Sequence, residues 1–314
     1  MEQKSPFTFA CPACRAELQS FSQDEQRCPA DGTIYHRQGR IWRFLTPERQ
    51  IYFERFIREY ETVRKAEGRG SNDAAYYQSL PFEDLTGRFS ADWTIRAFSF
   101  AALIERVIRP LEKEIKQPLK ILDLGAGNGW LSNRLSERGH QLAAVDLLTN
   151  AWDGLGAYIY YAATFTPVQA EFDRLPFSAG QADLAIYNAS FHYATNYASI
   201  LQEAFRTLKA RGQVVILDTP VYRQSTSGEQ MVRERQEQFK QLYGFPSDAL
   251  PSKNYLTDQE IRRLGIELGL YWKTVKPFYG LCWAVKPWLA RLRRQREPAR
   301  FVILIGRRAS NASN

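Results

Sequence analysis

Apolar runs alternate with helix-like stretches along the chain beyond residue 117. Continuous apolar runs are typical of strands that are buried on both faces of a sheet. Such runs predict strands at 119–124, 141–147, 166–171, 183–188 and 213–218, with two more at 300–306 and near 272–275. Alternation of strands with helices predicts an α/β fold, in which a doubly wound parallel sheet carries helices on both faces.

Helical periodicity dominates the segment before this alternation. Apolar residues at 52, 53, 56, 57 and 60 fit one helical face, and a second helix is predicted from Ser90 to Arg109, before Pro110. A long polar stretch at 220–258 has helix-like charge patterning from 228 to 243, which predicts an inserted cap. The chain therefore divides into residues 1–45, a helical linker or cap at 46–117, and residues 118–314.

Composition excludes several classes of protein. The 314 residues are 44% hydrophobic and 24% charged, which are ordinary globular values. No apolar run is long enough to span a membrane, and the first residues lack the apolar region of a signal peptide, so we expect a cytoplasmic protein. The net charge of +8 is concentrated in part at 291–296 and 307–308. A solvated helix face explains this cluster better than a nucleic-acid or lipid contact.

The most informative motif runs from Ile121 to Trp130. An apolar strand carrying Asp123 leads into glycines at 125, 127 and 129, which let a ligand approach the backbone closely. The dinucleotide fingerprint G-x-G-x-x-G requires a third glycine where this chain has Trp130. An acid at the strand end suits a ligand with an ammonium group, such as S-adenosylmethionine (SAM), better than a pyrophosphate.

This stretch resembles motif I of the class I SAM-dependent methyltransferases. Four further segments resemble that family's type 11 motifs in the right order: Ala144–Leu147, Ala170–Phe177, Ala182–Tyr193 and Leu208–Ile216. Departures are Glu171 in place of the usual Asp, and Ala-Arg in place of Pro-Gly before Gly212. The resemblance implies a seven-stranded Rossmann-like sheet whose last strand inserts antiparallel.

The resemblance also implies the residues that bind SAM. Asp123 would anchor the methionine end, and the turn of Gly125, Ala126, Gly127 and Gly129 would surround it. Asp146, followed by Leu147, would bind the ribose hydroxyls. Glu171 and the backbone of Phe172 would face the adenine, and Asn188 would accept a hydrogen bond from the SAM ammonium. Helices before motif I often cover the cofactor, so Tyr77, Trp93 and Arg96 are lid candidates, although a core role is favoured for them.

A cysteine pattern occupies the N-terminal segment. Cys11-x-x-Cys14 is followed by Cys28, with Asp31 where a second knuckle would have its last cysteine. This spacing is typical of a zinc ribbon and resembles those that precede some bacterial methyltransferases. Asp31 or His36 would be the fourth ligand of Zn²⁺. A metal-free ribbon is the main alternative, and a redox role is disfavoured because no thioredoxin-like pattern surrounds the motif.

The catalytic residue and the acceptor are less constrained. His192 is the histidine nearest the expected point of methyl transfer and is a candidate general base, whereas His140 is predicted to be exposed. Asp218 and Tyr222 could also face the pocket, and the segment Trp152–Tyr158 could line it. A small-molecule or lipid-like acceptor is favoured over rRNA or tRNA, and the absence of Asn-Pro-Pro-Tyr disfavours adenine N6. A SAM-binding protein that transfers no methyl group, as a lyase, cyclase or regulator, is the remaining alternative.

Overall fold

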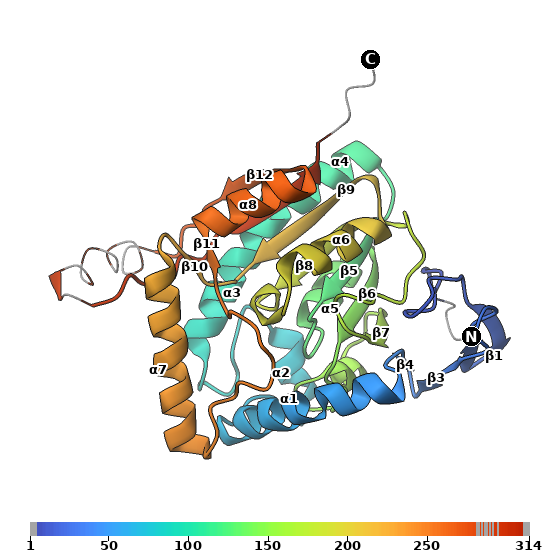
Figure 1. Ribbon diagram of the computed structural model, residues 1–314, viewed down its shortest axis with the longest axis horizontal. Coiled ribbons are helices and arrows are strands. Elements are labelled where there is room, and N and C mark those ends of the chain that lie inside the picture. The colour runs from blue at the N-terminus through green and yellow to red at the C-terminus, as the bar shows by residue number, and fades with distance from the viewer. Residues whose placement is uncertain are drawn as a thin grey trace.

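The computed structural model describes residues 5–280, 283, 285, 288, 290, 292, 293 and 295–309 (Figure 1). Its centre is a mixed sheet with five neighbouring parallel strands, which are β5 (Lys120–Leu124), β6 (Gln141–Asp146), β7 (Thr166–Gln169), β8 (Ala182–Asn188) and β9 (Leu208–Leu217). Two strands, β12 (Leu270–Val275) and β13 (Ile303–Arg308), complete one side. Since β13 runs antiparallel to both β9 and β12, the predicted antiparallel insertion is confirmed.

The sheet has eleven strands in the order β1-β2-β3-β4-β7-β6-β5-β8-β9-β13-β12, so the predicted count of seven is wrong for the sheet as a whole. The extra strands come from the N-terminal segment and are β1 (Gln19–Ser22), β2 (Glu25–Arg27), β3 (Ile34–Gln38) and β4 (Ile41–Arg43). Parallel pairing of Trp42 with Val168 joins β4 to β7. The N-terminal segment therefore covers an edge that would otherwise present unpaired backbone groups.

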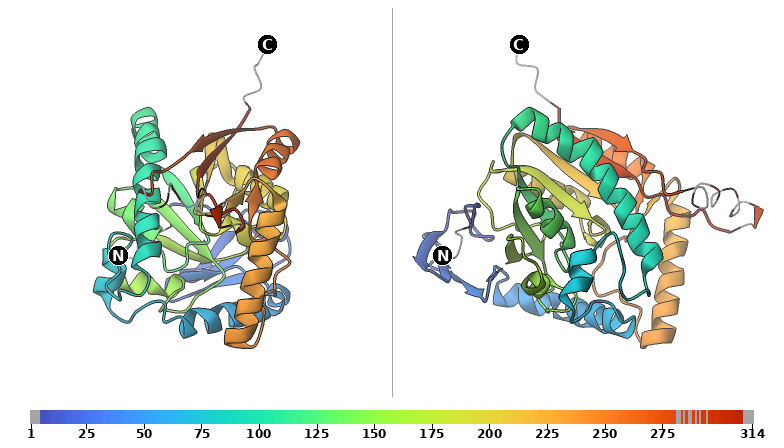
Figure 2. Two further views of the ribbon diagram at one scale, coloured as in Figure 1. Left: turned by 90° about the vertical axis from the view of Figure 1, so that its left-hand side faces the viewer. Right: turned by 180° about the vertical axis from the view of Figure 1, so that it is seen from behind.

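Helices cover both faces of the sheet (Figures 1 and 2). The helices of the N-terminal half are α1 (Pro47–Ala66), α2 (Ala74–Ser79), α3 (Ser90–Leu103), the π-helical η1 (Ile104–Ile108) and α4 (Arg109–Ile115). The later ones are α5 (Trp130–Glu137), α6 (Tyr197–Thr207), α7 (Ser225–Tyr243) and α8 (Asp258–Leu268), with short 3₁₀ turns η2 (Leu155–Tyr160) and η3 (Phe191–Tyr193). A two-residue pair, β10 (Val221–Tyr222) and β11 (Leu256–Thr257), flanks α7.

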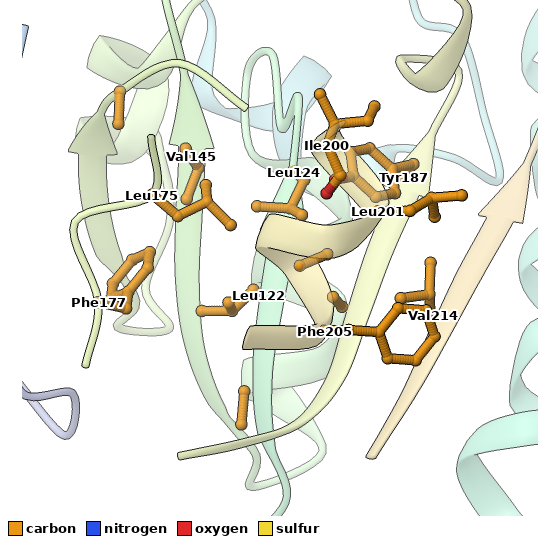
Figure 3. Close-up of a cluster of buried hydrophobic side chains, with 14 of the residues drawn as sticks. Leu122, Leu124, Val145, Leu175, Phe177, Tyr187, Ile200, Leu201, Phe205 and Val214 are labelled. Carbon is orange, nitrogen blue, oxygen red and sulfur yellow. The ribbon is translucent and has the colours of Figure 1, made fainter. Parts of the chain in front are cut away.

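Alternate residues of the strands supply two separate cores. Leu122 and Val145 belong to the core that includes Leu201 and Phe205 of α6, and Figure 3 shows Val145 beside Leu175 in this cluster. Side chains such as Ile121, which point the other way, pack with α3, η1 and α5. This alternation is the reason that the strands read as continuous apolar runs, because each strand is buried on both faces.

Three local predictions differ from the structure. The helix predicted to end before Pro110 continues to Ile115, because Pro110 lies in the first turn of α4, where its missing N–H costs no hydrogen bond. Strand β9 begins at Leu208 and not at residue 213, because a register shift against β8 absorbs the expected turn. His140 is buried and not exposed, and its Nδ1 accepts a hydrogen bond from the backbone of Leu119 at 3.3 Å.

Among the residues that the structure describes, no helix combines the length and the apolar character that crossing a bilayer requires. Of the predicted basic cluster, Arg291 and Arg294 lie outside the described residues. Arg296 forms an ion pair with Glu234 at 2.7 Å, and Arg308 lies over the ring of Phe205.

Candidate functional site

The glycine turn after β5 is held against the end of β6. The N–H groups of Gly125 and Ala126 both donate to the carbonyl of Val145, at 2.8 and 3.0 Å. Gly125 has a φ of 81°, and a Cβ atom there would lie 2.2 Å from the Cβ of Ser190. This position therefore admits only glycine, both for its left-handed backbone and for its contact with the β8 loop.

Asp146 ends β6 and binds the same turn. One carboxylate oxygen accepts the N–H of Gly127 and the other accepts the N–H of Leu148, each at 2.8 Å. Burial raises the pKa of the Asp146 carboxyl, and these N–H donors oppose that shift. Each oxygen keeps a further lone pair for a ligand, because a carboxylate oxygen accepts about two hydrogen bonds.

A pocket opens at the carboxyl ends of β5, β6 and β8. Its empty volume is about 870 Å³, including space that is open to solvent. Six of the residues predicted to bind the cofactor line it, namely Gly125, Gly127, Asp146, Leu147, Glu171 and Phe172. Ligand sites in open α/β sheets lie at this edge.

Helix α1 forms the opposite wall. The sequence predicted a helical linker or cap at 46–117, but it named no side chain of α1 as a pocket residue. The α1 side chains Arg49, Tyr52, Phe53, Phe56 and Tyr60 line the pocket. The apolar periodicity of this helix was visible in the sequence, but the pattern alone could not tell a core face from a pocket wall. Tyr52, which belongs to the helical face predicted from the sequence, is 45% exposed.

Glu171 is bound by an arginine from α1. The Arg49 guanidinium donates to both carboxylate oxygens, with Nε at 3.0 Å from each. Burial raises the pKa of Glu171, and the hydrogen bonds from Arg49 oppose this shift. Glu171 therefore lies in the pocket with part of its acceptor capacity already used.

Four residues predicted to bind the cofactor do not line this pocket: Asp123, Ala126, Gly129 and Asn188. Asp123 is buried behind the turn, where one oxygen accepts the Ser132 hydroxyl at 2.8 Å and the other has no partner among the described residues. Burial raises the pKa of Asp123 to about 7. The side-chain oxygen of Asn188 is likewise buried without a partner in the described part of the chain.

His192 lies in η3, beside the pocket wall but not in it. Burial, and then the charge of Arg235, lowers the pKa of His192 to about 3, so its imidazole is neutral near pH 7. Asp218 accepts the Ser99 hydroxyl at 2.5 Å, and burial raises its pKa to about 6. Neither Asp218 nor the buried Tyr222 lines this pocket.

Two of the lid candidates, Tyr77 and Trp93, occupy core positions. Tyr77 is fully buried and donates to the carbonyl of Trp152 at 2.6 Å. Trp93 is buried and lies under the guanidinium of Arg96, and none of these three candidates lines the pocket. The segment Trp152–Tyr158 also lies outside the pocket wall, and its Asp153 forms an ion pair with Arg64 of α1.

The N-terminal cysteines converge. Cys11, Cys14, Cys28 and Asp31 each offer a ligand atom, and all these atoms lie within 4.8 Å of one another. The Tyr35 hydroxyl is 3.3 Å from the sulfur of Cys11. His36, the other candidate for the fourth ligand, is exposed and lies 3.2 Å from Glu25. Of the two candidate fourth ligands, the structure therefore brings Asp31, and not His36, together with the three cysteines.

Comparison with known proteins agrees with this arrangement. Residues 122–216, which contain the glycine turn, Asp146, Glu171 and Asn188, match the family model described as a methyltransferase domain. This part of the chain is similar to methyltransferase domains. The match begins within β5 and ends within β9, so it includes neither α1 nor the cysteine cluster.

Curated relatives match only part of this chain. A malonyl-[acyl-carrier protein] O-methyltransferase 1 from Coxiella burnetii is 29% identical over 111 residues, 35% of this chain and 37% of that protein. A malonyl-[acyl-carrier protein] O-methyltransferase from Geobacter sulfurreducens is 30% identical over 131 residues, 40% of this chain and 48% of that protein. The chain thus spans less than half the length of these relatives.

Solved structures similar to this one include the plantazolicin methyltransferase BpumL in complex with SAH. The match has 16% identity and a TM-score of 0.47, and covers 80% of this chain and 100% of that one. A SAM-dependent methyltransferase from Mesorhizobium loti matches with 18% identity and a TM-score of 0.46, over 61% of this chain and 92% of that one.

Proposed function

We propose that this protein is a SAM-dependent methyltransferase that transfers a methyl group to a small-molecule or lipid-like acceptor. The observation that carries the proposal is the single pocket in which the Gly125 turn, the carboxylate of Asp146 and the aromatic wall of α1 meet. The family match covers the first two of these features, and α1 adds the third.

The residues of the pocket fit the chemistry of SAM. Asp146 keeps free lone pairs that suit two ribose hydroxyls, and Gly125 allows the turn to pack directly against Ser190. Glu171 and Phe172 lie where an adenine would contact the wall, with Arg49 also binding Glu171. Asp123 and Asn188 each have a buried oxygen without a partner among the described residues, and such acceptors would suit the ammonium group of SAM.

The bound cofactor would supply an activated methyl group on a sulfonium. The protein has to hold donor and acceptor in line and to exclude water. Phe56, Tyr60 and Tyr193 form an apolar wall suited to an uncharged or lipid-like acceptor body. The names of the curated relatives, which act on malonyl groups of an acyl-carrier protein, favour an acyl acceptor over RNA. His192 then needs no part in proton transfer if the acceptor arrives ionised.

We further propose that the cysteine cluster binds Zn²⁺. Zinc–sulfur bonds of about 2.3 Å place tetrahedral ligands about 3.8 Å apart. The sulfurs of Cys14 and Cys28 are 3.4 Å apart, and that of Cys11 is 3.8 Å from an oxygen of Asp31. Residues 1–45 would then be a zinc-stabilised ribbon, 46–117 a cap, and 118–314 the catalytic segment with its insertion at 220–258.

Binding and transfer experiments test the proposal separately. Calorimetry should show binding of S-adenosylhomocysteine (SAH) and no binding of NAD⁺. Labelled SAM should then transfer its methyl group to the organic-soluble or acyl-carrier fraction of a cell extract and not to its purified RNA. SAH binding without transfer to any fraction would instead favour a non-methylating SAM protein.

A further inference from the structure

A second cavity adjoins the cofactor pocket between α1 and α7. Its empty volume is about 710 Å³, including space open to solvent. It shares Phe56, Tyr60, Tyr193 and Leu250 with the first pocket, so the two are separated by one layer of side chains. Figure 1 and the right-hand view of Figure 2 show α1 and α7 meeting at one corner of the molecule.

The charges in this cavity do not balance locally. Arg64 is paired with Asp153, with its Nη2 at 2.9 Å from a carboxylate oxygen, and Arg69 is paired with Glu67 at 2.7 Å. Arg235 of α7 has no ion pair or hydrogen bond with any described residue, and its Nε is buried. A buried N–H group without a partner costs free energy, so this guanidinium is suited to an anion that the chain itself does not supply.

Apart from these paired charges, the residues that line the cavity with Arg235 are neutral or aromatic. The guanidinium lies over the ring of Phe239 at 5.9 Å, on the next turn of α7. Its charge contributes to keeping His192 uncharged. The Nδ1 atom of His192 also lacks a partner among the described residues. One unpaired positive charge beside a neutral imidazole and an aromatic wall suits a ligand with one negative charge and an apolar body.

We propose that Arg235 binds a carboxylate of the methyl acceptor, and that the acceptor is an apolar carboxylic acid or a carboxylated acyl chain whose body lies along Phe56, Tyr60 and Tyr193. This inference rests on the proposed methyltransferase function and adds the chemical class of its substrate. A carboxylate is favoured over a phosphate because a single guanidinium balances a single charge. Arg235 is thus a specificity-determining residue for the acceptor.

Calorimetry with three protein variants tests this assignment. The wild type, Arg235→Gln and Arg233→Gln should bind SAH with similar affinity. Arg233 is the matched control because it lies on the same helix but is exposed and lines neither cavity. With SAH saturating, the wild type should bind octanoate about ten- to a hundredfold more tightly than octanamide, the range for a hydrogen bond to a charged partner. Arg235→Gln should lose this preference and Arg233→Gln should keep it.

The outcomes separate the two proposals. Failure of all variants to bind SAH would overturn the methyltransferase proposal itself. Normal SAH binding with equal affinity for octanoate and octanamide would overturn only the role of Arg235, and tighter binding of octyl phosphate than of octanoate would overturn the carboxylate. If Arg235→Gln does not fold, Arg235→Lys keeps the charge without the planar fork, and should retain a reduced preference for octanoate.

Discussion

Replacing Asp146 by Asn should weaken both cofactor binding and the stability of the fold, and binding somewhat more. The carboxylate accepts two backbone N–H groups, from Gly127 and Leu148, and offers its remaining lone pairs to the pocket. The amide of an asparagine turns one acceptor into a donor and removes the charge, so one of the two N–H groups loses its partner. Hydrogen bonds to charged groups contribute about 1.5–3 kcal/mol each.

The expected loss follows from these contacts. One lost N–H contact should lower the free energy of unfolding by about 1–3 kcal/mol. Two weakened hydrogen bonds to the ribose should cost about 2–4 kcal/mol of binding, which is roughly a 30- to 700-fold rise in the Kd of SAH. Thermal melting measures the first quantity and calorimetry measures the second.

Asp183 provides the matched control. It is also buried, and one oxygen accepts the backbone N–H of Lys120 at 2.8 Å while the other contacts Lys209 at 2.7 Å. Asp183 lies near the start of β8, at the opposite end of the strands from the pocket. Asp183→Asn should therefore lower the melting temperature without changing the Kd of SAH. The reasoning fails if folded Asp146→Asn binds SAH within about threefold of the wild type, or if Asp183→Asn loses as much affinity.

Four further outcomes are expected. Burial raises the folded pKa of Asp123 to about 7, above its unfolded value. The stability that Asp123 contributes is therefore present at low pH and is lost as pH rises through 7. The melting temperature of Asp123→Asn should lack this decline. The pKa of His192 is lowered to about 3, so its imidazole stays neutral from pH 5 to 8. The methyl-transfer rates of the wild type and of His192→Ala should therefore vary in parallel over this range. A loss of rate below pH 6.5 in the wild type alone would show that His192 is a base of ordinary pKa. Gly125→Ala should abolish SAH binding, because the added Cβ meets Ser190 at 2.2 Å; a normal Kd in calorimetry would contradict the structure of the turn. Elemental analysis should find about one zinc per chain, and EDTA should lower the melting temperature of the wild type but not that of Cys28→Ser; equal melting with and without EDTA would favour a metal-free ribbon.

The sequence predicted the parallel sheet well because its signal is local. Each central strand is buried on both faces, so its apolar run is visible without knowledge of its neighbours. The antiparallel position of β13 came from the resemblance to a family and not from the pattern. The pairing of β4 with β7 could not be predicted, because strand pairing between residues so far apart leaves no periodic signal.

The site, like the sheet, was predicted where its signal is local in the sequence and missed where it depends on contacts between distant residues. Gly125, Asp146 and Glu171 lie in the pocket because their motif positions fix them at strand ends. The wall of α1 was missed because an amphipathic helix gives the same pattern whether it covers a core or a cavity. The ion pair of Arg49 with Glu171 joins residues that are far apart in the sequence, and only the folded chain brings them together.

One loop of the cofactor pocket connects all three segments of the chain. From the N-terminal segment, Arg15 donates to the carbonyl of Asp173 at 3.3 Å. From the helical cap, Arg49 binds the side chain of Glu171, and from α6, Arg206 donates to the carbonyl of Leu175 at 3.0 Å. Three guanidinium groups from separate segments thus hold the stretch that includes Glu171 and Phe172. Because Arg15 directly follows Cys14, a metal bound at the cysteine cluster would also fix one of these three contacts. We therefore propose that the N-terminal segment supports this loop of the pocket.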